Sequence, residues 1–178
     1  MLLAAGLASA QQQQLVIERD WSSVSTFYRD CVQVMNDGSY RFEHSSISSQ
    51  EPRSLQIHAG KFSEDEMKQF EAMLDDPALA PLTTPMLNRQ QMTLGTDIDT
   101  FWVGITRGDN AQLLFFDSTS SSGKKYSSEQ FPSLYRTAAM KPLLEWYKQM
   151  GKRKGDVDKK ATSTCSFQVR SQVRPPLK

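Results

Sequence analysis

The sequence contains few of the residues that build metal centres and nucleophilic active sites. It has only two cysteines and two histidines, which leaves little material for a metal site. It has no Gly-x-Ser-x-Gly elbow, no Ser-x-x-Lys motif accompanied by its partner motifs, and no glycine-rich phosphate loop. From the sequence we therefore expect no catalytic residue, no metal and no cofactor.

The sequence also lacks a strong charge of either sign. Its 21 basic and 20 acidic residues leave a net charge of +1, which gives no field to recruit nucleic acid. The basic stretch 152–160 is interrupted by Asp156 and Asp158 and is typical of a solvated linker, with contact to an anionic envelope polymer or lipid head groups as the alternative. The apolar content suffices for one globular domain, which we place at 15–151, with 152–178 as a basic linker and tail.

The one apolar run at the N-terminus is too short to span a membrane as a helix. Leu2 to Ala10 reads LLAAGLASA, an apolar core that ends in the small residues of a signal-peptide cleavage site. We expect 1–10 to be a signal peptide cleaved before Gln11, although a basic leader is absent. The mature chain would then be secreted or periplasmic, without a transmembrane segment.

Export changes the expected chemistry of the two cysteines. Cys31 and Cys165 each stand at the head of an alternating, strand-like run. Cysteine pairs oxidise in exported proteins, so we expect a Cys31–Cys165 disulfide that staples the C-terminal tail to an early strand. Two free thiols are the alternative.

The strongest strand signal is 101–117, which reads as a β-hairpin. A three-residue loop, 108–110, would set Ile105 opposite Leu113 and Trp102 opposite Phe116. A two-residue loop would set Ile105 opposite Gln112, so the pattern favours the longer loop.

With this register both faces of the hairpin are apolar, since Gly104 would lie opposite Leu114. Two interpretations remain open. The hairpin is buried on both faces, or Trp102, Leu114 and Phe116 form an uncovered patch that binds a protein or peptide.

A second hairpin is expected at 31–44, with 36–38 as a three-residue loop and Gly38 in a left-handed conformation. Val34 would then face Tyr40, and Val32 would face Phe42. One face of this hairpin is apolar and the other polar, which is typical of a sheet with one wet side.

The remaining segments supply short strands and two helices. Strands are expected at 15–17, 55–58 and, at the sheet edge, 165–169. A capping box of Ser63 and Glu66 begins one helix, which Pro77 stops. The other helix follows Pro142 and ends at Gly151. The order predicts an α+β fold, with an antiparallel sheet built from two hairpins plus one or two further strands and two main helices packed on one face.

Two phrases carry a family resemblance. The run CVQVMNDGSYRFE, and KFSEDEMKQFEAMLDDPAL after the following strand, resemble small exported bacterial α+β domains of unassigned activity. The resemblance covers about 31–150. It implies an exported α+β domain and no particular substrate.

The candidate chemical groups are sparse. Asp97 and Asp99 would lie on one side of an extended segment and could bind a cation or act in acid–base chemistry. His44 and His58 are expected on opposite sides of neighbouring strands. We therefore expect an exported, non-enzymatic binding or accessory domain of the bacterial envelope. A metal-dependent or hydrolytic enzyme that uses Asp97 and Asp99, and a structural envelope protein, are the alternatives.

Overall fold

The computed structural model describes residues 12–23, 25–50, 54–83, 97–121, 124–125, 138–153, 156–157 and 162–165. For 97–99, 115–121, 124–125 and 156–157 it describes the backbone alone. The expected signal peptide, 1–10, lies outside the described residues.

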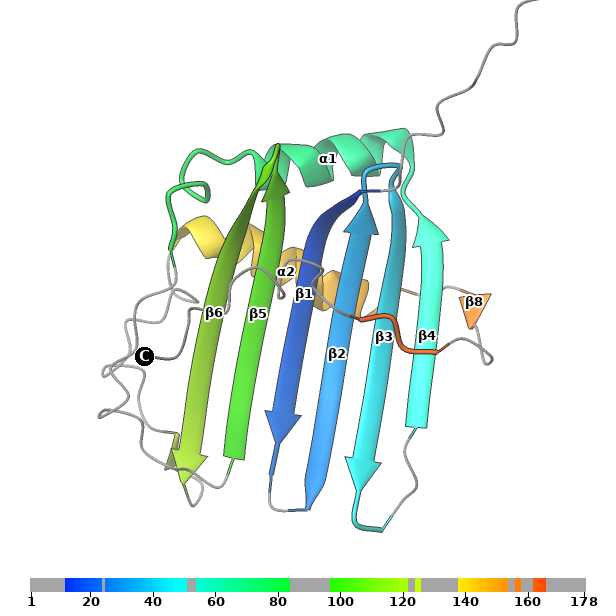
Figure 1. Cartoon of the computed structure of the whole chain (residues 1–178), viewed down its shortest axis with the longest axis vertical. Coiled ribbons are helices and arrows are strands. Elements are labelled where there is room, and N and C mark those ends of the chain that lie inside the picture. The colour runs from blue at the N-terminus through cyan, green and yellow to red at the C-terminus, as the bar shows by residue number, and fades with distance from the viewer. Residues whose placement is uncertain are drawn as a thin grey trace, which may run out of the picture.

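An antiparallel sheet forms the centre of the described structure (Figure 1). Its order is β7-β6-β5-β1-β2-β3-β4-β8. The six long strands are β1 Gln13–Ser22, β2 Thr26–Met35, β3 Ser39–Ser48, β4 Ser54–Lys61, β5 Asp97–Arg107 and β6 Asn110–Ser121. Two-residue strands, β7 Lys124–Lys125 and β8 Asp156–Val157, lie at the edges. The predicted α+β class, with an antiparallel sheet and two helices, is confirmed.

The two helices begin where the sequence signals indicate. α1, Glu64–Leu74, has the predicted capping box, in which the Ser63 amide donates to Glu66 and the Glu66 amide donates to the Ser63 hydroxyl. α2, Lys141–Met150, follows a short 3₁₀ turn, η3 Ala138–Met140, and has Pro142 in its first turn. Figure 1 shows both helices on the same side of the sheet.

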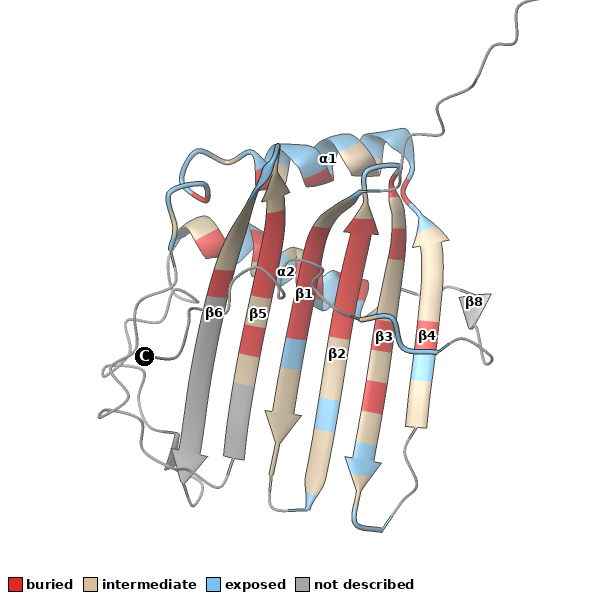
Figure 2. Ribbon diagram, viewed as in Figure 1, coloured by how far each residue is buried: buried red, intermediate tan, exposed pale blue. Residues whose placement is uncertain are grey.

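The main core lies between that side of the sheet and the helices. Alternate residues of the central strands share one cluster with the inward residues of α1 and α2. Figure 2 shows the buried residues gathered in the middle of the sheet. In an antiparallel sheet this alternation sends every second residue to the same face. The fully or almost fully buried members of the cluster include Leu15, Ile17, Val32, Val34, Phe70, Phe101, Val103, Ile105, Leu114, Leu143 and Met150.

The β2–β3 hairpin has the predicted register. Val34 pairs with Tyr40 and Val32 with Phe42, and Gly38 has a φ of 79°. Both strands extend well beyond the predicted ends. Residues 21–22 and 26–28, which no sequence pattern assigned, form the end of β1 and the start of β2.

The register predicted for the β5–β6 hairpin is wrong by one residue. Arg107 pairs with Asn110, so the loop has two residues, and Val103 pairs with Leu114. Ile105 therefore lies opposite Gln112, the arrangement that apolar matching argued against.

Contacts with the chain after α1 explain this register. The Gln112 side-chain amide donates to the carbonyl oxygens of Leu79, Ala80 and Leu82 at 2.8, 3.2 and 3.0 Å. Its own carbonyl oxygen accepts from Arg107 at 2.9 Å. A polar side chain on the core face is stable where its hydrogen bonds are satisfied, and these partners come from a distant segment that strand patterning does not include.

Replacing Gln112 with leucine tests this account. Although Gln112→Leu improves the apolar pattern, we expect it to destabilise the protein by about 1–3 kcal/mol because it removes the side-chain donor shared by three carbonyl groups and the acceptor of the Arg107 hydrogen bond. Denaturant unfolding measures the difference. Gln56→Leu, at an exposed position of β4, is the matched control and should change stability by less than about 0.5 kcal/mol. Equal effects at the two positions would contradict the assigned role of Gln112.

Candidate functional site

A short C-terminal segment covers part of the sheet face opposite to the helices. We call residues 162–165 the strap. In Figure 1 the strap crosses in front of β3, whereas α1 and α2 lie behind the sheet. The face that the sequence predicted to be wet is therefore covered at its centre, and Gln33 and Glu43 beneath the strap are 5% and 3% exposed.

The strap is joined to β2 by a disulfide. Cys165 is bonded to Cys31 across a Cα–Cα distance of 6.1 Å, as the sequence predicted. Cys31 is fully buried, and it packs with Val16 and the partly buried Cys165. Cys165 itself lies outside any strand, and the rest of the predicted edge strand, 166–169, lies outside the described residues. Among the described strands, the one next to β4 at this edge is β8.

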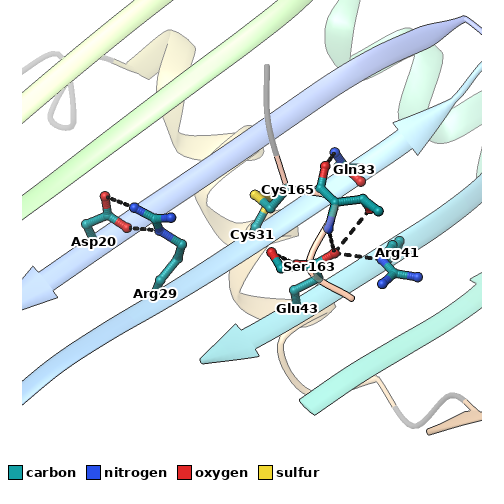
Figure 3. Close-up of a disulfide and its surroundings, with 9 residues drawn as sticks. Asp20, Arg29, Cys31, Gln33, Arg41, Glu43, Ser163 and Cys165 are labelled. Carbon is teal, nitrogen blue, oxygen red and sulfur yellow. Dashed lines mark hydrogen bonds and ion pairs between the residues drawn. A yellow bond between two sulfur atoms is a disulfide. The ribbon is translucent and has the colours of Figure 1, made fainter. Parts of the chain in front are cut away.

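The carboxylate of Glu43 is the polar centre of the strap contact (Figure 3). It accepts hydrogen bonds from the Ser163 hydroxyl at 2.6 Å, from the Thr164 amide at 3.0 Å and from Arg41 at 2.7 Å. Gln33 and Arg41 donate in turn to the carbonyl oxygens of Thr164 and Thr162, at 3.2 and 3.0 Å. Two neighbouring strands thus hold the strap by both its side chains and its backbone.

The disulfide holds the strap at β2 covalently. Five hydrogen bonds also join the strap to β2 and β3, and four of them involve the charge of Glu43 or Arg41. At about 0.5–3 kcal/mol each, much of what these bonds contribute is offset by the cost of ordering four residues, which is about 4–8 kcal/mol for the backbone alone. The covalent link at Cys165 is therefore an important part of what keeps the strap on the sheet.

A second feature lies on the helix side of the sheet. An open depression of about 290 Å³ is lined by Arg19, Trp21, Tyr28, Asp30 and His44, from β1, β2 and β3. We call these five residues the aromatic depression. The rings of Trp21 and Tyr28 stack at 5.3 Å between centroids, and those of Tyr28 and His44 at 6.1 Å.

The walls of the aromatic depression are held by polar contacts. His44 Nδ1 lies 2.6 Å from one Asp30 oxygen. The Tyr147 hydroxyl of α2 donates to the other at 3.4 Å. On the reverse face of the same β1–β2 hairpin, Arg29 donates to both Asp20 oxygens at 2.6 and 3.1 Å. The residues of the aromatic depression therefore belong to a part of the sheet that is held by hydrogen bonds and ion pairs between side chains.

The aromatic depression was not predicted from the sequence, because its residues come together only through the pairing register of β1, β2 and β3. Trp21 pairs with Tyr28, and Asp30 pairs with both Arg19 and His44. The available signal was the pair of aromatic residues, Trp21 and Tyr28, on either side of the Ser/Thr-rich segment 22–26, a pattern that is typical of a hairpin.

The three residues of the predicted binding patch do not form one surface. Leu114 is fully buried in the core beside Val103. Trp102, the neighbour of Val103 on β5, points to the opposite face, where it pairs with Glu18. Phe116 pairs with Phe101, and its side chain lies outside the described residues. The prediction of one continuous patch is therefore wrong, because it rested on the three-residue loop.

The other candidate residues are also separated or undescribed. Asp97 and Asp99 lie on β5 opposite Ser120 and Ser118, and their side chains lie outside the described residues. His58 pairs with Phe42, which puts it on the same face as His44 and corrects the predicted opposite orientation. Among the side chains that the structure describes, no three His, Cys, Asp or Glu residues are grouped to hold a metal.

Neither helix in the described part of the chain has the length and apolar character to cross a membrane. The chain matches no protein-family model and no curated protein.

The strap contact should weaken in acid. Burial by itself raises the pKa of Glu43, but hydrogen bonds from Ser163, Arg41 and the Thr164 amide outweigh it, and the pKa lies below the ordinary 4.5. A carboxyl group with a lowered folded-state pKa adds stability that is complete above its unfolded pKa and is lost as the pH falls through the folded value.

We expect Glu43→Gln to destabilise the oxidised protein by about 1–3 kcal/mol at neutral pH, since it removes a charged acceptor of several hydrogen bonds. This difference should shrink as the pH falls below the unfolded-state pKa of a glutamate and through the lower folded-state pKa of Glu43, where the wild-type carboxylate becomes protonated. Thermal unfolding from about pH 7 to about pH 3 measures it. Glu71→Gln, at an exposed position of α1, is the control. A pH-independent difference for Glu43→Gln would contradict the assignment.

Proposed function

We propose that the protein is an exported, non-enzymatic binding or accessory domain of the bacterial envelope and that the aromatic depression is its contact surface. The observation that carries this proposal is the open group of stacked aromatic rings, edged by Arg19 and Asp30. Its expected partner is a protein or peptide.

The chemistry of the aromatic depression supports binding. Tyr28 is 39% exposed, although stacking on Trp21 and the Asp30–His44 contact fix its surroundings. Large, ordered aromatic side chains lose little conformational entropy when a partner docks, and Trp, Tyr and Arg are the residues most enriched at binding hot spots. Charged groups of both signs beside the rings provide directional contacts.

The disulfide supports export. Disulfides persist in the oxidising compartments outside the cytoplasm, and the Cys31–Cys165 bond closes a sequence separation of 134 residues. The Leu2–Ala10 run has the composition of a signal peptide. Together these features favour a secreted or periplasmic location.

A second candidate function, acid–base catalysis, is favoured by one contact. His44 lies 2.6 Å from Asp30, and a carboxylate that orients a histidine is a frequent part of a general base. The neighbouring Ser46 hydroxyl, however, hydrogen-bonds with Ser54 at 2.7 Å. A binding surface gives a role to all five residues of the aromatic depression, whereas catalysis would involve only Asp30 and His44. We therefore prefer the binding function.

Site-specific photo-crosslinking in the native envelope tests the binding proposal. A benzoylphenylalanine replaces Tyr28 in one sample and Ile47 in the other. Ile47 is 45% exposed and lies on the opposite face of β3, so it is a matched control for accessibility. We expect a discrete adduct from position 28 that is absent from position 47, with the partner identified by mass spectrometry.

Binding of the identified partner to Trp21→Ala, read beside Ile47→Ala, completes the test. We expect Trp21→Ala to weaken binding about thirtyfold, the effect of losing a hot-spot residue, and Ile47→Ala to change it little. Circular dichroism checks that both variants fold. Adducts at both positions, or at neither, would contradict the proposed surface.

A further inference from the structure

The Cys31–Cys165 disulfide joins a fully buried cysteine to a partly exposed one. Cys31 is fully buried in β2, whereas Cys165 is partly exposed at the end of the strap. Thiol–disulfide exchange requires the attacking thiolate to reach a sulfur atom directly. Since Cys31 has no exposed surface, Cys165 is the half of the bond that we expect an external thiol to approach.

Buried carboxylates flank the inner sulfur. Cys31 pairs with Glu18 of β1 and Glu43 of β3, which are 2% and 3% exposed. Paired residues project to the same face of an antiparallel sheet, so both glutamates lie on the disulfide side. Negative charge that develops on Cys31 as the disulfide breaks is disfavoured by these neighbours, although Arg41 offsets the charge of Glu43. Exposure therefore directs attack to Cys165, whereas the neighbouring carboxylates slow this same step because Cys31 must leave as a thiolate.

We propose that Cys165 is a thiol-exchange site and that the strap is a latch opened by exchange at this site. The thiolate of a small thiol or of a dithiol protein attacks Sγ of Cys165, and a new S–S bond joins these two atoms. The Cys31–Cys165 bond breaks, and Cys31 leaves with the electron pair as a thiolate that takes a proton from solvent. With a dithiol, the second thiol then attacks the mixed disulfide, frees Cys165 and leaves the dithiol oxidised.

Release of the strap follows from the balance of forces on it. Without the disulfide, the entropy cost of ordering the segment offsets much of what the hydrogen bonds to Glu43, Gln33 and Arg41 contribute. The freed strap carries Ser163 and Thr164 away from the sheet. The uncovered face contains both apolar and polar groups, namely Val16, Cys31, Gln33 and Glu43. This latch lies on the face opposite to the aromatic depression and does not depend on the proposed binding function.

Trapping the mixed disulfide tests the entry point. The folded, oxidised protein is incubated with reduced glutathione, quenched in acid, denatured and alkylated, and its peptides are read by mass spectrometry. We expect glutathione on Cys165 and the alkyl group on Cys31, in at least about tenfold excess over the reverse arrangement. Glutathione predominantly on Cys31 would overturn the proposal.

Variants of the strap contact test the latch. Glu43→Gln removes the charge beside Cys31 and weakens the strap, so we expect exchange about tenfold faster or more. Ser163→Ala removes one strap contact at an exposed residue and should accelerate exchange to a smaller extent. If Glu43→Gln fails to fold, the Ser163→Ala variant still tests the latch. Glu71→Gln and Ser49→Ala, both exposed and distant in the fold, are the matched controls. Unchanged rates in both strap variants would overturn the latch.

Hydrogen exchange reports the release itself. The Thr164 amide donates to Glu43 at 3.0 Å in the oxidised protein, so it should be protected. After complete reduction with dithiothreitol we expect that protection to be lost while the amides of β1 and β2 keep theirs. Retained protection at Thr164 would show that the strap stays closed and would contradict the proposal.

Discussion

The structure depends on the pairing of β1 with strands on both of its sides. β1 is joined to β2 by a hairpin and pairs along most of its length with β5, which follows α1 much later in the sequence. Without this pairing the sheet would divide into a β2–β3–β4 unit and a β5–β6 unit. The central residues of β1 are buried on both faces of the sheet. Leu15 and Ile17 belong to the main core, whereas Val16 and Glu18 are buried on the face that carries the strap. Burial on both faces is what a central strand requires.

The alternation of side chains along β2 and β3 places the aromatic depression and the strap contact on opposite faces of the same two strands. On β2, Asp30 faces the aromatic depression and the next residue, Cys31, faces the strap. On β3, His44 faces the depression and Glu43 faces the strap. Since successive side chains of a strand point to opposite faces, one pair of strands supplies both sites. A single-residue slip would exchange the two faces, so the register that buries the core also positions both sites.

Local signals in the sequence predicted local structure well. The capping box at Ser63 and Glu66 and the turn ending in Gly38 depend on neighbouring residues, and both are present. The β5–β6 loop was predicted wrongly because Gln112 is stabilised by carbonyl groups after α1. The disulfide followed from the expected compartment. The role of Glu43 and the aromatic depression depend on the path of the tail and on the register of three strands, which no local pattern specifies.

The sheet should insulate its two faces from each other. For opening of the strap to alter the aromatic depression, β2 or β3 would have to move, and energetic coupling requires an element with two discrete arrangements. Val32 and Val34 on β2 and Tyr40 on β3 are buried in the helix-side core, and a slip of either strand would remove them from it. That loss far exceeds the small net stability of the strap's hydrogen bonds. Opening the strap therefore changes access to one face of the sheet and leaves the geometry of the other intact, so the disulfide and the aromatic depression act as independent devices on one scaffold.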